Sequence, residues 1–565
     1  MPIPKHKRNR LIEFKMVQNS FLALIEQSIR INWEYPALTE LQGKTLYYKD
    51  FAREIDQLHE FFKIEGIKKG DKIALCGKNS ANWAIAFFAT LSYGAVSVSI
   101  LNEFDSKSVQ FIVDHSDTKV LFADEGIWNS LDKSNLSKLN TVYSLDDYSL
   151  LKSDSEDLKQ FVSNSSDYFA KKYEKGFFVN DVAFRLDKPE ELAVINYTSG
   201  TTSSPKGVMV PYRSLWSNTK YANENVNFVH PGVNVLCMLP TAHTYGLAFE
   251  ILNSIALGSN ICFLGKAPTP RVLQDAFAQT KPKLVLAVPL ILEKIVNKVV
   301  LPKLEVGTAA KLVKIPLLNK IVYKKVRKSM IDFFGGNLVE VVVGGAGLNH
   351  EVENFLKKIK FPFTVGYGMT ECGPLISYVY WSDYRKRSSG QVVDRMQAKI
   401  DSEDQENIVG EILVKGSNVM LGYYKNEEAT KQTFTEDGWL KTCDLGTMDK
   451  DKFIYIRGRN KNMILGPSGQ NIYPEEIEER LNSSPYIHES LAIGEDHRIV
   501  ALIVPDLDTL EQEGIEKEMW NEIYRKVVDD INKTLPSYSK IASFRMQEEF
   551  EKTPKRSIRR FKYQE

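Results

Sequence analysis

The chain has 565 residues, of which 43% are hydrophobic and 26% charged, and this composition is typical of a globular protein. The length exceeds that of one ordinary hydrophobic core, so two or more domains are expected. The formal net charge is +1, so the protein has no overall field that would attract nucleic acid, and we expect no nucleic-acid partner.

The spacing of the cysteines and the N-terminal residues indicate the cellular compartment that we expect for the protein. The five cysteines stand far apart and none belongs to a C-x-x-C pair, which argues against zinc and disulfide frameworks and favours a reducing, cytoplasmic compartment. Residues 1–15 are basic but no apolar run follows, so they do not predict a secretory signal. Ala81–Ile100 is uncharged and long enough to imitate a membrane span. Its polar residues and Gly94 favour a buried helix followed by a strand.

Strand and helix patterns alternate along most of the chain, which predicts an α/β fold with parallel sheets covered on both faces. Residues 125–190 are polar and weakly patterned, and we expect helices and loops there. Predicted helices are Lys49–Ile64, Asn79–Tyr93, Ser106–His115, Gly246–Leu257 and Val272–Gln279. Predicted strands are Lys72–Cys76, Val96–Ile100, Val120–Ala123, Val233–Leu239, Ile261–Leu264, Leu284–Val288, Leu338–Val343 and Phe363–Val365.

The last third of the chain changes character. Asn407–Gly422 and Asp437–Ile456 are short strands with turns, which indicates a small β subdomain. From Arg459 onward the pattern is that of a separate, small α+β unit. We place the boundary at Gly458–Lys461, giving domains 1–458 and 459–565. In the second domain we expect helices near Pro474–Leu481 and Glu516–Leu535 and a hairpin of Ser490–Ile493 with Ile499–Val504.

The most informative stretch is Asn196–Gly207, between the buried strand Leu192–Ile195 and a helical pattern from about Tyr212. Its hydroxyl side chains, two glycines and Lys206 suit a polyphosphate, which needs many small donors near a helix start and a positive charge. It is not a Walker A loop, because the lysine precedes the glycine and no Ser or Thr follows. A polar surface linker is the alternative. The hydroxyl residues are Thr198, Ser199, Thr201, Thr202, Ser203 and Ser204.

Other candidate residues also follow predicted strands, where ligands of open parallel sheets bind. The small residues of Gly344–Gly347 would let a flat ring lie against the backbone, unless they are only a tight turn. In Tyr367–Glu371, Tyr367 offers a stacking face, Thr370 a hydroxyl and Glu371 a carboxylate for Mg²⁺ bound to phosphate. A Thr-Glu pair alone would more often begin a helix. Asp444 could accept hydrogen bonds from both hydroxyls of a ribose.

These motifs together resemble the adenylate-forming enzymes, the superfamily of acyl-CoA ligases, luciferases and peptide-synthetase adenylation domains. The resemblance extends from about Phe21 to Tyr563, and includes Gly438–Gly446 and Arg457–Asn462. Ser203 and Cys443 stand where the family usually has Gly. We expect Cys443 to be tolerated as a small buried residue without a redox function.

The resemblance implies roles for individual residues. ATP would be bound by Gly345 and Ala346 at adenine, Tyr367 and Gly368 beside it, Asp444 at the ribose and Arg459 at the ribose or phosphate. Lys461 would lie at a hinge about which a mobile C-terminal lid rotates, and the Gly466–Asn471 loop would line the pantetheine tunnel. Thr201 and Glu371 would hold Mg²⁺. The phosphate-binding residues would be Thr198, Ser199, Gly200, Thr201 and Thr202, and the catalytic residues Lys206, His243, Thr370 and Glu371.

The roles of His243 and of the Thr553–Arg560 segment each have an alternative interpretation. A lone histidine such as His243 is often structural, although the resemblance places it between the acyl pocket and the α-phosphate. In Thr553–Arg560, Ser557 occupies the position of the family's catalytic lysine. A serine cannot neutralise the charge that develops during in-line attack. We hypothesise that Lys555 or Arg556 substitutes for it, and the alternative is a slow or disabled first step.

Residues 301–330 hold eight Lys/Arg and a single acid, Glu305. A solvated helix face is the ordinary interpretation of such a segment. Because apolar residues interleave with the cations, a peripheral membrane contact is the second interpretation, and it would add membrane association to a cytoplasmic location.

The resemblance is closest to bacterial long-chain fatty acid ligases. It implies an AMP-forming ligase that takes ATP, a fatty acid and coenzyme A, with Mg²⁺ as cofactor. The alternatives are an aryl or medium-chain acid–CoA ligase, a loader of a carrier-protein thiol, and a non-catalytic acyl- or nucleotide-binding homologue suggested by Ser557. The oligomeric state is open, with a homodimer as one candidate.

Overall fold

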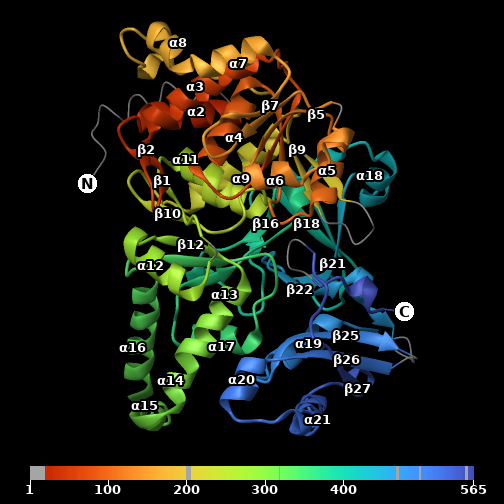
Figure 1. Cartoon of the computed structure of the whole chain (residues 1–565). Helices are drawn as coiled ribbons and strands as arrows, with labels where there is room; N and C mark the ends of the chain where they lie inside the picture. The colour runs from red at the N-terminus through yellow and green to blue at the C-terminus, as the bar shows by residue number, and fades with distance from the viewer. Residues whose placement is uncertain are drawn as a thin grey trace.

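The computed structural model describes residues 19–136, 138–198, 205–266, 268–316, 318–465, 470–495, 498–553 and 558–564. Figure 1 shows a large N-terminal domain, in which helices flank the sheets, and a smaller C-terminal domain below it. This arrangement confirms the α/β class predicted from the alternating patterns.

The largest sheet has eight strands in the order β20-β9-β8-β4-β3-β5-β6-β7. Strands β8, β4, β3, β5 and β6 run parallel, and β9, β20 and β7 add antiparallel edges. The antiparallel partners and β6 are the strands that the sequence patterns missed. The bounds are β3 Lys72–Cys76, β4 Val96–Ile100, β5 Thr118–Ala123, β6 Thr141–Ser144, β7 Leu150–Ser153, β8 Leu192–Thr198, β9 Lys206–Pro211 and β20 Gly422–Tyr423.

Two further sheets complete the α/β core. One has the order β10-β11-β1-β2, with β2 antiparallel, and the other has three parallel strands in the order β12-β13-β14. All five strands predicted between residues 230 and 365 are present, within two residues at each end. The bounds are β1 Pro36–Glu40, β2 Thr45–Tyr47, β10 Asn234–Cys237, β11 Asn260–Phe263, β12 Leu284–Ala287, β13 Glu340–Val343 and β14 Phe363–Val365.

The helix α4 (Ala81–Tyr93) shows why the uncharged stretch is a core element. Every residue from Ala81 to Ser92 except Asn82 is buried, and β4, which follows, is buried throughout. Ser80 caps the first turn by accepting the Trp83 N–H at 3.1 Å, and Gly94 ends the helix in the left-handed conformation with φ 100°. Across the described residues, no helix is both long and apolar enough to cross a membrane.

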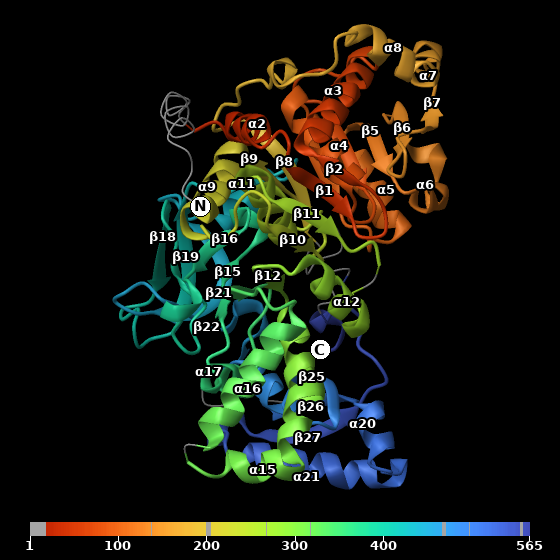
Figure 2. The same ribbon diagram turned by 90° about the vertical axis from the view of Figure 1, so that its left-hand side faces the viewer.

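The other helices of the N-terminal domain pack mostly on the faces of these sheets (Figures 1 and 2). They are α2 Phe21–Ile31, α3 Tyr48–Ile64, α5 Ser106–His115, α6 Glu125–Ser130, α7 Glu156–Ser163, α8 Ser165–Lys172, α9 Tyr212–Asn225, α10 Thr244–Gly246, α11 Asn253–Leu257, α12 Pro270–Thr280, α13 Pro289–Lys294, α14 Leu301–Glu305, α15 Gly307–Val313, α16 Leu318–Phe333, α17 His350–Lys358 and α18 Glu427–Thr433. Two segments, η4 Leu247–Leu252 and η5 Ile295–Val300, are π-helical. Short 3₁₀ helices are η2 Lys133–Asn135, η3 Val179–Asp181, η6 Thr370–Cys372 and η7 Trp381–Asp383.

The helices α14, α15 and α16 form an arm. Figures 1 and 2 show it extending from the N-terminal domain toward the same end of the molecule as the C-terminal domain. The arm contains the basic segment 301–330. Its side chains include exposed apolar groups: Val306 is 65% exposed, Ile321 56% and Ile315 46%.

The β subdomain that the sequence predicts at Asn407–Gly422 and Asp437–Ile456 corresponds to an antiparallel sheet of the order β18-β19-β21-β22. A second small antiparallel sheet, of the order β15-β16-β17, was not predicted. Their bounds are β15 Tyr367–Gly368, β16 Leu375–Tyr378, β17 Gln391–Val392, β18 Met396–Asp401, β19 Gly410–Gly416, β21 Leu440–Met448 and β22 Ile454–Arg459.

The C-terminal domain is mixed α+β, with the predicted hairpin β25-β26 extended by β27, which lies parallel to β26. The first predicted helix corresponds to α19, and the second begins later than predicted, at Trp520. The buried side chains of this domain form clusters of their own, which share no residue with those of the N-terminal domain. The bounds are η8 Asn460–Asn462, β23 Ile464–Leu465, β24 Asn471–Ile472, α19 Pro474–Asn482, β25 Ile487–Glu495, β26 Arg498–Pro505, α20 Leu507–Gln512, η9 Lys517–Met519, α21 Trp520–Asn532, η10 Ser537–Ser539, β27 Ile541–Met546 and η11 Arg560–Lys562.

Candidate active site

The hydroxyl-rich loop connects two antiparallel strands rather than a strand and a helix. Thr198 at the end of β8 pairs with Lys206 at the start of β9, and α9 begins only after β9. The expectation that the loop lies at a helix start was therefore wrong, because the short strand Lys206–Pro211 intervenes. Of the predicted phosphate-binding residues, Ser199, Gly200, Thr201 and Thr202 lie outside the described residues, while Thr198 and Lys206 fix the two ends of the loop.

Lys206 and Glu371 meet around a tyrosine that the sequence patterns did not indicate. The Lys206 Nζ atom lies 5.1 Å from the centre of the Tyr423 ring, and the Tyr423 hydroxyl donates to Glu371 Oε1 at 2.9 Å. Strand β20 brings Tyr423 there by pairing with β9. Burial and the Glu371 carboxylate raise the pKa of Tyr423 well above its usual range, so the phenol remains a donor. Lys206, the predicted cation, and Glu371, the predicted metal ligand, therefore both contact Tyr423 and form one cluster with it.

Asp444 is the centre of a second cluster. It is 7% exposed, and its two oxygens lie 2.6 Å from the Tyr367 hydroxyl and 3.1 Å from Arg459 Nε. Strands β21 and β22 pair Asp444 with Arg459 directly, so the register of the sheet sets this contact. Burial, followed by the Asp444 carboxylate, raises the pKa of Tyr367 well above its usual range. Three residues predicted for the ribose and adenine side therefore lie together.

The glycine-rich stretch after β13 has the open surface that a flat ring needs. Gly345, Ala346 and Gly347 are exposed, and a Cβ added at Gly345 or Gly347 would meet no atom within 4 Å. Gly344 differs, because a Cβ there would come within 3.1 Å of the Tyr245 ring. Tyr245 is fixed by its hydroxyl, which donates to the Val342 carbonyl at 3.0 Å. The prediction for Gly345 and Ala346 fits this geometry.

Gly368 and Thr370 follow β14 in the same region. A Cβ added at Gly368 would lie 2.3 Å from the Pro374 carbonyl oxygen, so only glycine fits this close approach. Thr370 begins η6 and is 8% exposed, and Glu371, the next residue, is half-buried. The Thr-Glu pair does begin a helical turn, which was the ordinary interpretation, but the turn also directs Glu371 to Tyr423.

His243 lies at the start of α10, in the stretch that follows β10. Its Nδ1 accepts the Tyr245 N–H at 3.2 Å, so the ring has a structural role as a helix cap. The Asn196 side chain donates to the Ala242 carbonyl at 2.7 Å, which ties this stretch to β8 just before the phosphate-type loop. The structure therefore places the residue before His243 in contact with β8, and the predicted catalytic role of His243 stays a prediction.

Cys443 departs from expectation. The side chain is exposed, and its φ of 59° lies in the left-handed region that favours glycine. The prediction of a small buried residue was wrong, because the side chain faces solvent, and the left-handed φ is a backbone reason for glycine to be favoured at this position. The Cys443 N–H donates to Glu411 Oε1 at 2.8 Å, which joins β21 to β19 at the irregularity in their pairing before Asp444.

The domain junction lies directly after this cluster. Lys461 is exposed in η8, two residues beyond Arg459, and Arg457 lies within 4.0 Å of Glu476 on α19. Residues 466–469 of the Gly466–Asn471 loop lie outside the described residues. So do Lys555, Arg556 and Ser557. The flanking residues Lys552 and Ile558 pair with each other, so the ends of the 553–557 segment are held together.

The fit of a Mg²⁺ ion can be judged on Glu371. Magnesium is commonly bound by one or two carboxylates together with substrate phosphates and water. Glu371 is a half-buried carboxylate, and one of its oxygens accepts the Tyr423 hydroxyl. Tyr423 in turn contacts Lys206 at the start of β9. A carboxylate in this position suits such a site. Among the described residues there is no group of three or more His, Cys, Asp or Glu that could hold an ion by itself.

Comparison with known families gives two matches along the chain. The AMP-binding enzyme family matches residues 25–424, and the AMP-binding enzyme C-terminal domain matches residues 461–565. The chain belongs to the AMP-binding enzyme family, and its class is that of the ATP-dependent adenylate-forming ligases.

Curated relatives resemble the chain at modest identity. It is 27% identical over 80% of its length to the long-chain-fatty-acid–CoA ligase FadD15 of Mycobacterium bovis, covering 75% of that protein. It is 26% identical over 87% of its length to the long-chain-fatty-acid–CoA ligase ACSBG2 of Rattus norvegicus, covering 78% of it. It is 26% identical over 85% of its length to the long-chain-fatty-acid–CoA ligase 1 of Saccharomyces cerevisiae, covering 74% of that protein.

Solved structures share the fold across both domains. ATP-bound MatB from Rhodopseudomonas palustris superposes with a TM-score of 0.75 at 19% identity, covering 96% of this chain and 98% of MatB. The O-succinylbenzoate coenzyme A synthetase of Bacillus subtilis, in complex with ATP and magnesium, gives a TM-score of 0.71 at 19% identity, with 95% and 98% coverage. These likenesses confirm the fold with its large and small domains.

Proposed function

We propose that this protein is an AMP-forming ligase that activates a long-chain fatty acid with Mg²⁺ and ATP and transfers the acyl group to coenzyme A. The observation that carries the proposal is the pair of clusters around Tyr423 and Asp444, which gather five of the predicted ATP-site residues from distant parts of the chain. The long-chain preference is supported by the curated relatives, all three of which are named as long-chain ligases.

The chemistry follows from the leaving group. A carboxylate is a poor acyl donor, because an oxide would have to leave. Attack of the carboxylate on the α-phosphate of ATP forms an acyl-adenylate and releases pyrophosphate, after which AMP is the leaving group when the thiol of coenzyme A attacks. Mg²⁺ held at Glu371 would neutralise charge on the phosphates.

The residues of the chain would divide this work. Asp444 would accept the ribose hydroxyls, and Arg459 beside it would contact the ribose or a phosphate. Gly345 and Ala346 would face the adenine ring. Lys206, at the end of the hydroxyl-rich loop, would stabilise charge on the phosphates as the bond to pyrophosphate breaks.

The position of Ser557 requires another cation in the first half-reaction. We propose Lys555 or Arg556, which precede it in the same short segment between the paired residues Lys552 and Ile558. Replacing both by alanine should reduce ATP–pyrophosphate exchange strongly. If exchange is barely changed, neither residue substitutes for the lysine.

The function is tested by AMP release with Mg·ATP, coenzyme A and acids from acetate to oleate, with benzoate and cinnamate included. If AMP release is fastest with long-chain acids, the proposal is supported. If it is fastest with benzoate or with a medium-chain acid, the substrate is an aryl or medium-chain acid instead. Activity only with a carrier-protein thiol identifies a loader. If ATP binds but no acid gives AMP, the protein is the non-catalytic binder that Ser557 suggests.

We also propose that the α14–α16 arm touches an anionic membrane surface, which would bring the enzyme to its acyl substrate. The arm combines exposed apolar side chains with the cations of residues 301–330. This is the combination that interfacial helices use, since apolar groups insert while cations contact lipid headgroups.

A further inference from the structure

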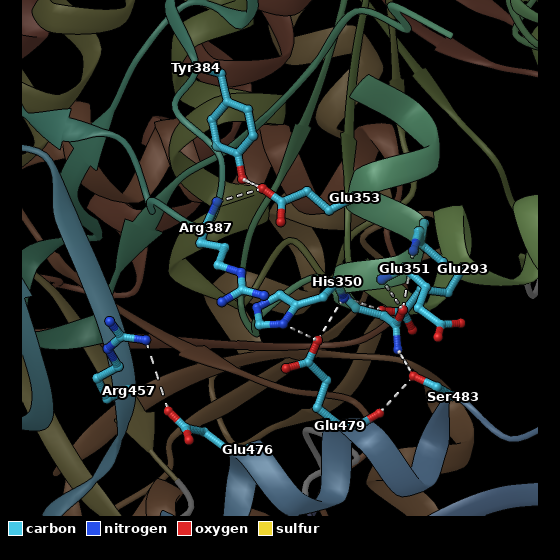
Figure 3. Close-up of polar contacts among 12 residues, drawn as sticks. Glu293, His350, Glu351, Glu353, Tyr384, Arg387, Arg457, Glu476, Glu479 and Ser483 are labelled. Atoms are coloured by element: carbon cyan, nitrogen blue, oxygen red, sulfur yellow. Dashed lines mark hydrogen bonds and ion pairs between the residues drawn. The ribbon is translucent and has the colours of Figure 1, made fainter. Parts of the chain in front are cut away.

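The two domains meet through helix ends as well as through the hinge. Figure 3 shows the N-terminus of α17, from the N-terminal domain, facing α19 of the C-terminal domain. Glu479 Oε1 accepts the His350 N–H at 2.6 Å, and the Asn349 side chain donates to Ser483 Oγ at 2.9 Å. We call these four residues (Asn349, His350, Glu479 and Ser483) the clasp.

The clasp works as a helix cap shared between domains. Asn349 is the N-cap of α17 and accepts the N–H groups of Glu351 and Val352 at 2.9 and 3.2 Å. This leaves the His350 N–H for a carboxyl oxygen of Glu479. Burial raises the pKa of Glu479 to about 7, so the group brings a full negative charge to the positive end of the α17 dipole only above that pH, while its oxygen accepts the N–H in either state. Ser483 lies at the other helix's C-terminus and donates to the Glu479 carbonyl at 3.0 Å. The two helix dipoles therefore meet with opposite ends.

Residues behind α17 hold its N-terminus in place on the N-terminal domain. Glu293 accepts the Asn349 N–H at 3.0 Å, and Glu353 accepts both the Tyr384 hydroxyl and the Arg387 N–H at 2.7 Å. These bonds lie within the N-terminal domain, so α17 is already positioned without the clasp. The clasp adds only contacts that are lost when the C-terminal domain moves.

The contact of His350 with Glu479 is not an ion pair. The His350 Nδ1 atom lies 3.1 Å from Glu479 Oε1. Burial, followed by the charges of Arg387, Lys386, Arg480 and Arg457, lowers the pKa of His350 to about 4, so its ring is neutral at neutral pH. Glu479 therefore stabilises the docked domain mainly through the backbone N–H that it caps.

We infer that Glu479 and Ser483 are positioning residues, which hold the C-terminal domain in the orientation of this structure by capping α17, and that the clasp opens when this domain rotates. That the rotation separates two half-reactions rests on the proposed function. In the rotated state the His350 N–H and the Asn349 amide would bond to water. The clasp thus selects one of the two orientations and with it one of the two half-reactions.

The first test measures domain orientation without any reaction. Spin labels at Asn129→Cys and Gln512→Cys, both exposed positions on different domains, report their distance in a Cys443→Gly background that removes the exposed native thiol. We expect the distance of this structure to dominate, and Glu479→Ala with Ser483→Ala to reduce its population about 10-fold relative to other distances. Glu518→Ala, an exposed glutamate of the same domain, is the matched control and should change nothing.

An unchanged distance distribution in the double variant, or the absence of this distance in the parent, overturns the inference whatever the enzyme's activity. Alanine favours helices, so α19 should remain folded in the variant. The second test separates the half-reactions, as ATP–pyrophosphate exchange and as transfer from a prepared acyl-adenylate to coenzyme A. We expect one rate to fall about 10-fold while the other stays or rises, and a parallel fall of both contradicts the clasp.

Discussion

Asp444 divides its two oxygens between the Tyr367 hydroxyl and the Arg459 guanidinium. If the carboxylate also accepts the ribose hydroxyls, Asp444→Asn should raise the KM for ATP by about 10- to 100-fold, which is the effect of losing hydrogen bonds to a charged group. The measurement is AMP release against ATP concentration. Tyr367→Phe is the control, since it keeps the ring and loses only the bond to Asp444, and we expect a change of a few-fold. Equal losses would mean that Asp444 acts through Tyr367 alone.

Cys443 adopts a left-handed backbone conformation that costs a residue with a Cβ about 1 kcal/mol or more relative to glycine. Cys443→Gly should therefore raise the free energy of unfolding of the N-terminal domain by up to about 1 kcal/mol, with ATP binding unchanged. Urea denaturation of the two proteins measures the difference. Cys443→Ala, which keeps the Cβ, should give no such gain. A gain from alanine as well would point to the thiol rather than the backbone.

At the scale of elements, the π-helical segment η4 carries a fully buried carboxyl group. Glu250 is 0% exposed and accepts the Leu239 N–H at 3.0 Å. Burial raises the pKa of Glu250 from 4.5 to about 8, so the folded state holds its proton more tightly than the unfolded state does. Stability should therefore fall as the pH rises from about 4.5 to about 8.

Glu250→Gln keeps an acceptor for Leu239 and removes this titration. We expect wild type and variant to have similar unfolding free energies at pH 5 and the variant to be more stable at pH 9, by on the order of 3 kcal/mol. Urea unfolding at both values measures this. Parallel pH profiles for the two proteins would show that Glu250 does not change its protonation on folding.

The basic arm is the second element with a testable role. Each lysine near an anionic surface contributes about 1 kcal/mol, so reversing four charges should weaken binding to vesicles by about 100-fold or more. Sedimentation with phosphatidylcholine vesicles, with and without phosphatidylglycerol, measures the binding. The exposed lysines to be changed to Glu are Lys320, Lys324, Lys325 and Lys328.

A matched variant separates position from net charge. Four exposed lysines outside the arm are changed to Glu in the same way, and this variant should bind as wild type does. Equal weakening in both would show a general charge effect, and no binding by wild type would leave the arm a solvated face. The control lysines are Lys68, Lys107, Lys171 and Lys450.

The sequence predicted most elements for identifiable reasons. The parallel strands were found because buried strands read as continuous apolar runs. The candidate site residues were singled out because strand ends followed by Gly, Thr or acidic residues carry a local pattern, and the structure brings five of them into two clusters. The antiparallel strand β9 was missed, since Lys206–Gly207 looks like the end of a loop until its pairing with β8 is seen.

Long-range contacts were the remaining gap. Tyr423 joins Lys206 and Glu371 only through the pairing of β20 with β9, more than 200 residues earlier in the chain. The pair Tyr423-Tyr424 after Gly422 is an aromatic signal that could have marked it. The exposure and the left-handed φ of Cys443 depend on the tertiary structure, and the residue type does not indicate them.

At the scale of the whole molecule, the hydrophobic clusters of the two domains are separate. We therefore expect calorimetry to show two unfolding transitions, in keeping with a boundary at Gly458–Lys461. Leu481 is 0% exposed in a C-terminal cluster, and Leu481→Ala should cost about 2–5 kcal/mol and lower that domain's transition by roughly 10 °C or more. The other transition should stay in place. A single transition that moves as a whole would mean that the domains unfold together.

The contacts of the clasp are polar, and each has water as a ready substitute. An exchange of this kind changes the free energy by only about 1 kcal/mol per hydrogen bond. Two such bonds are enough for one arrangement of the domains to prevail at rest, yet the differential affinity of a nucleotide or a thiol substrate can reverse the balance. An apolar interface of the same size would have to be desolvated and rehydrated in every catalytic cycle. Under the proposed rotation, the polar contact would let the enzyme change arrangement at each turnover without a deep energetic trap.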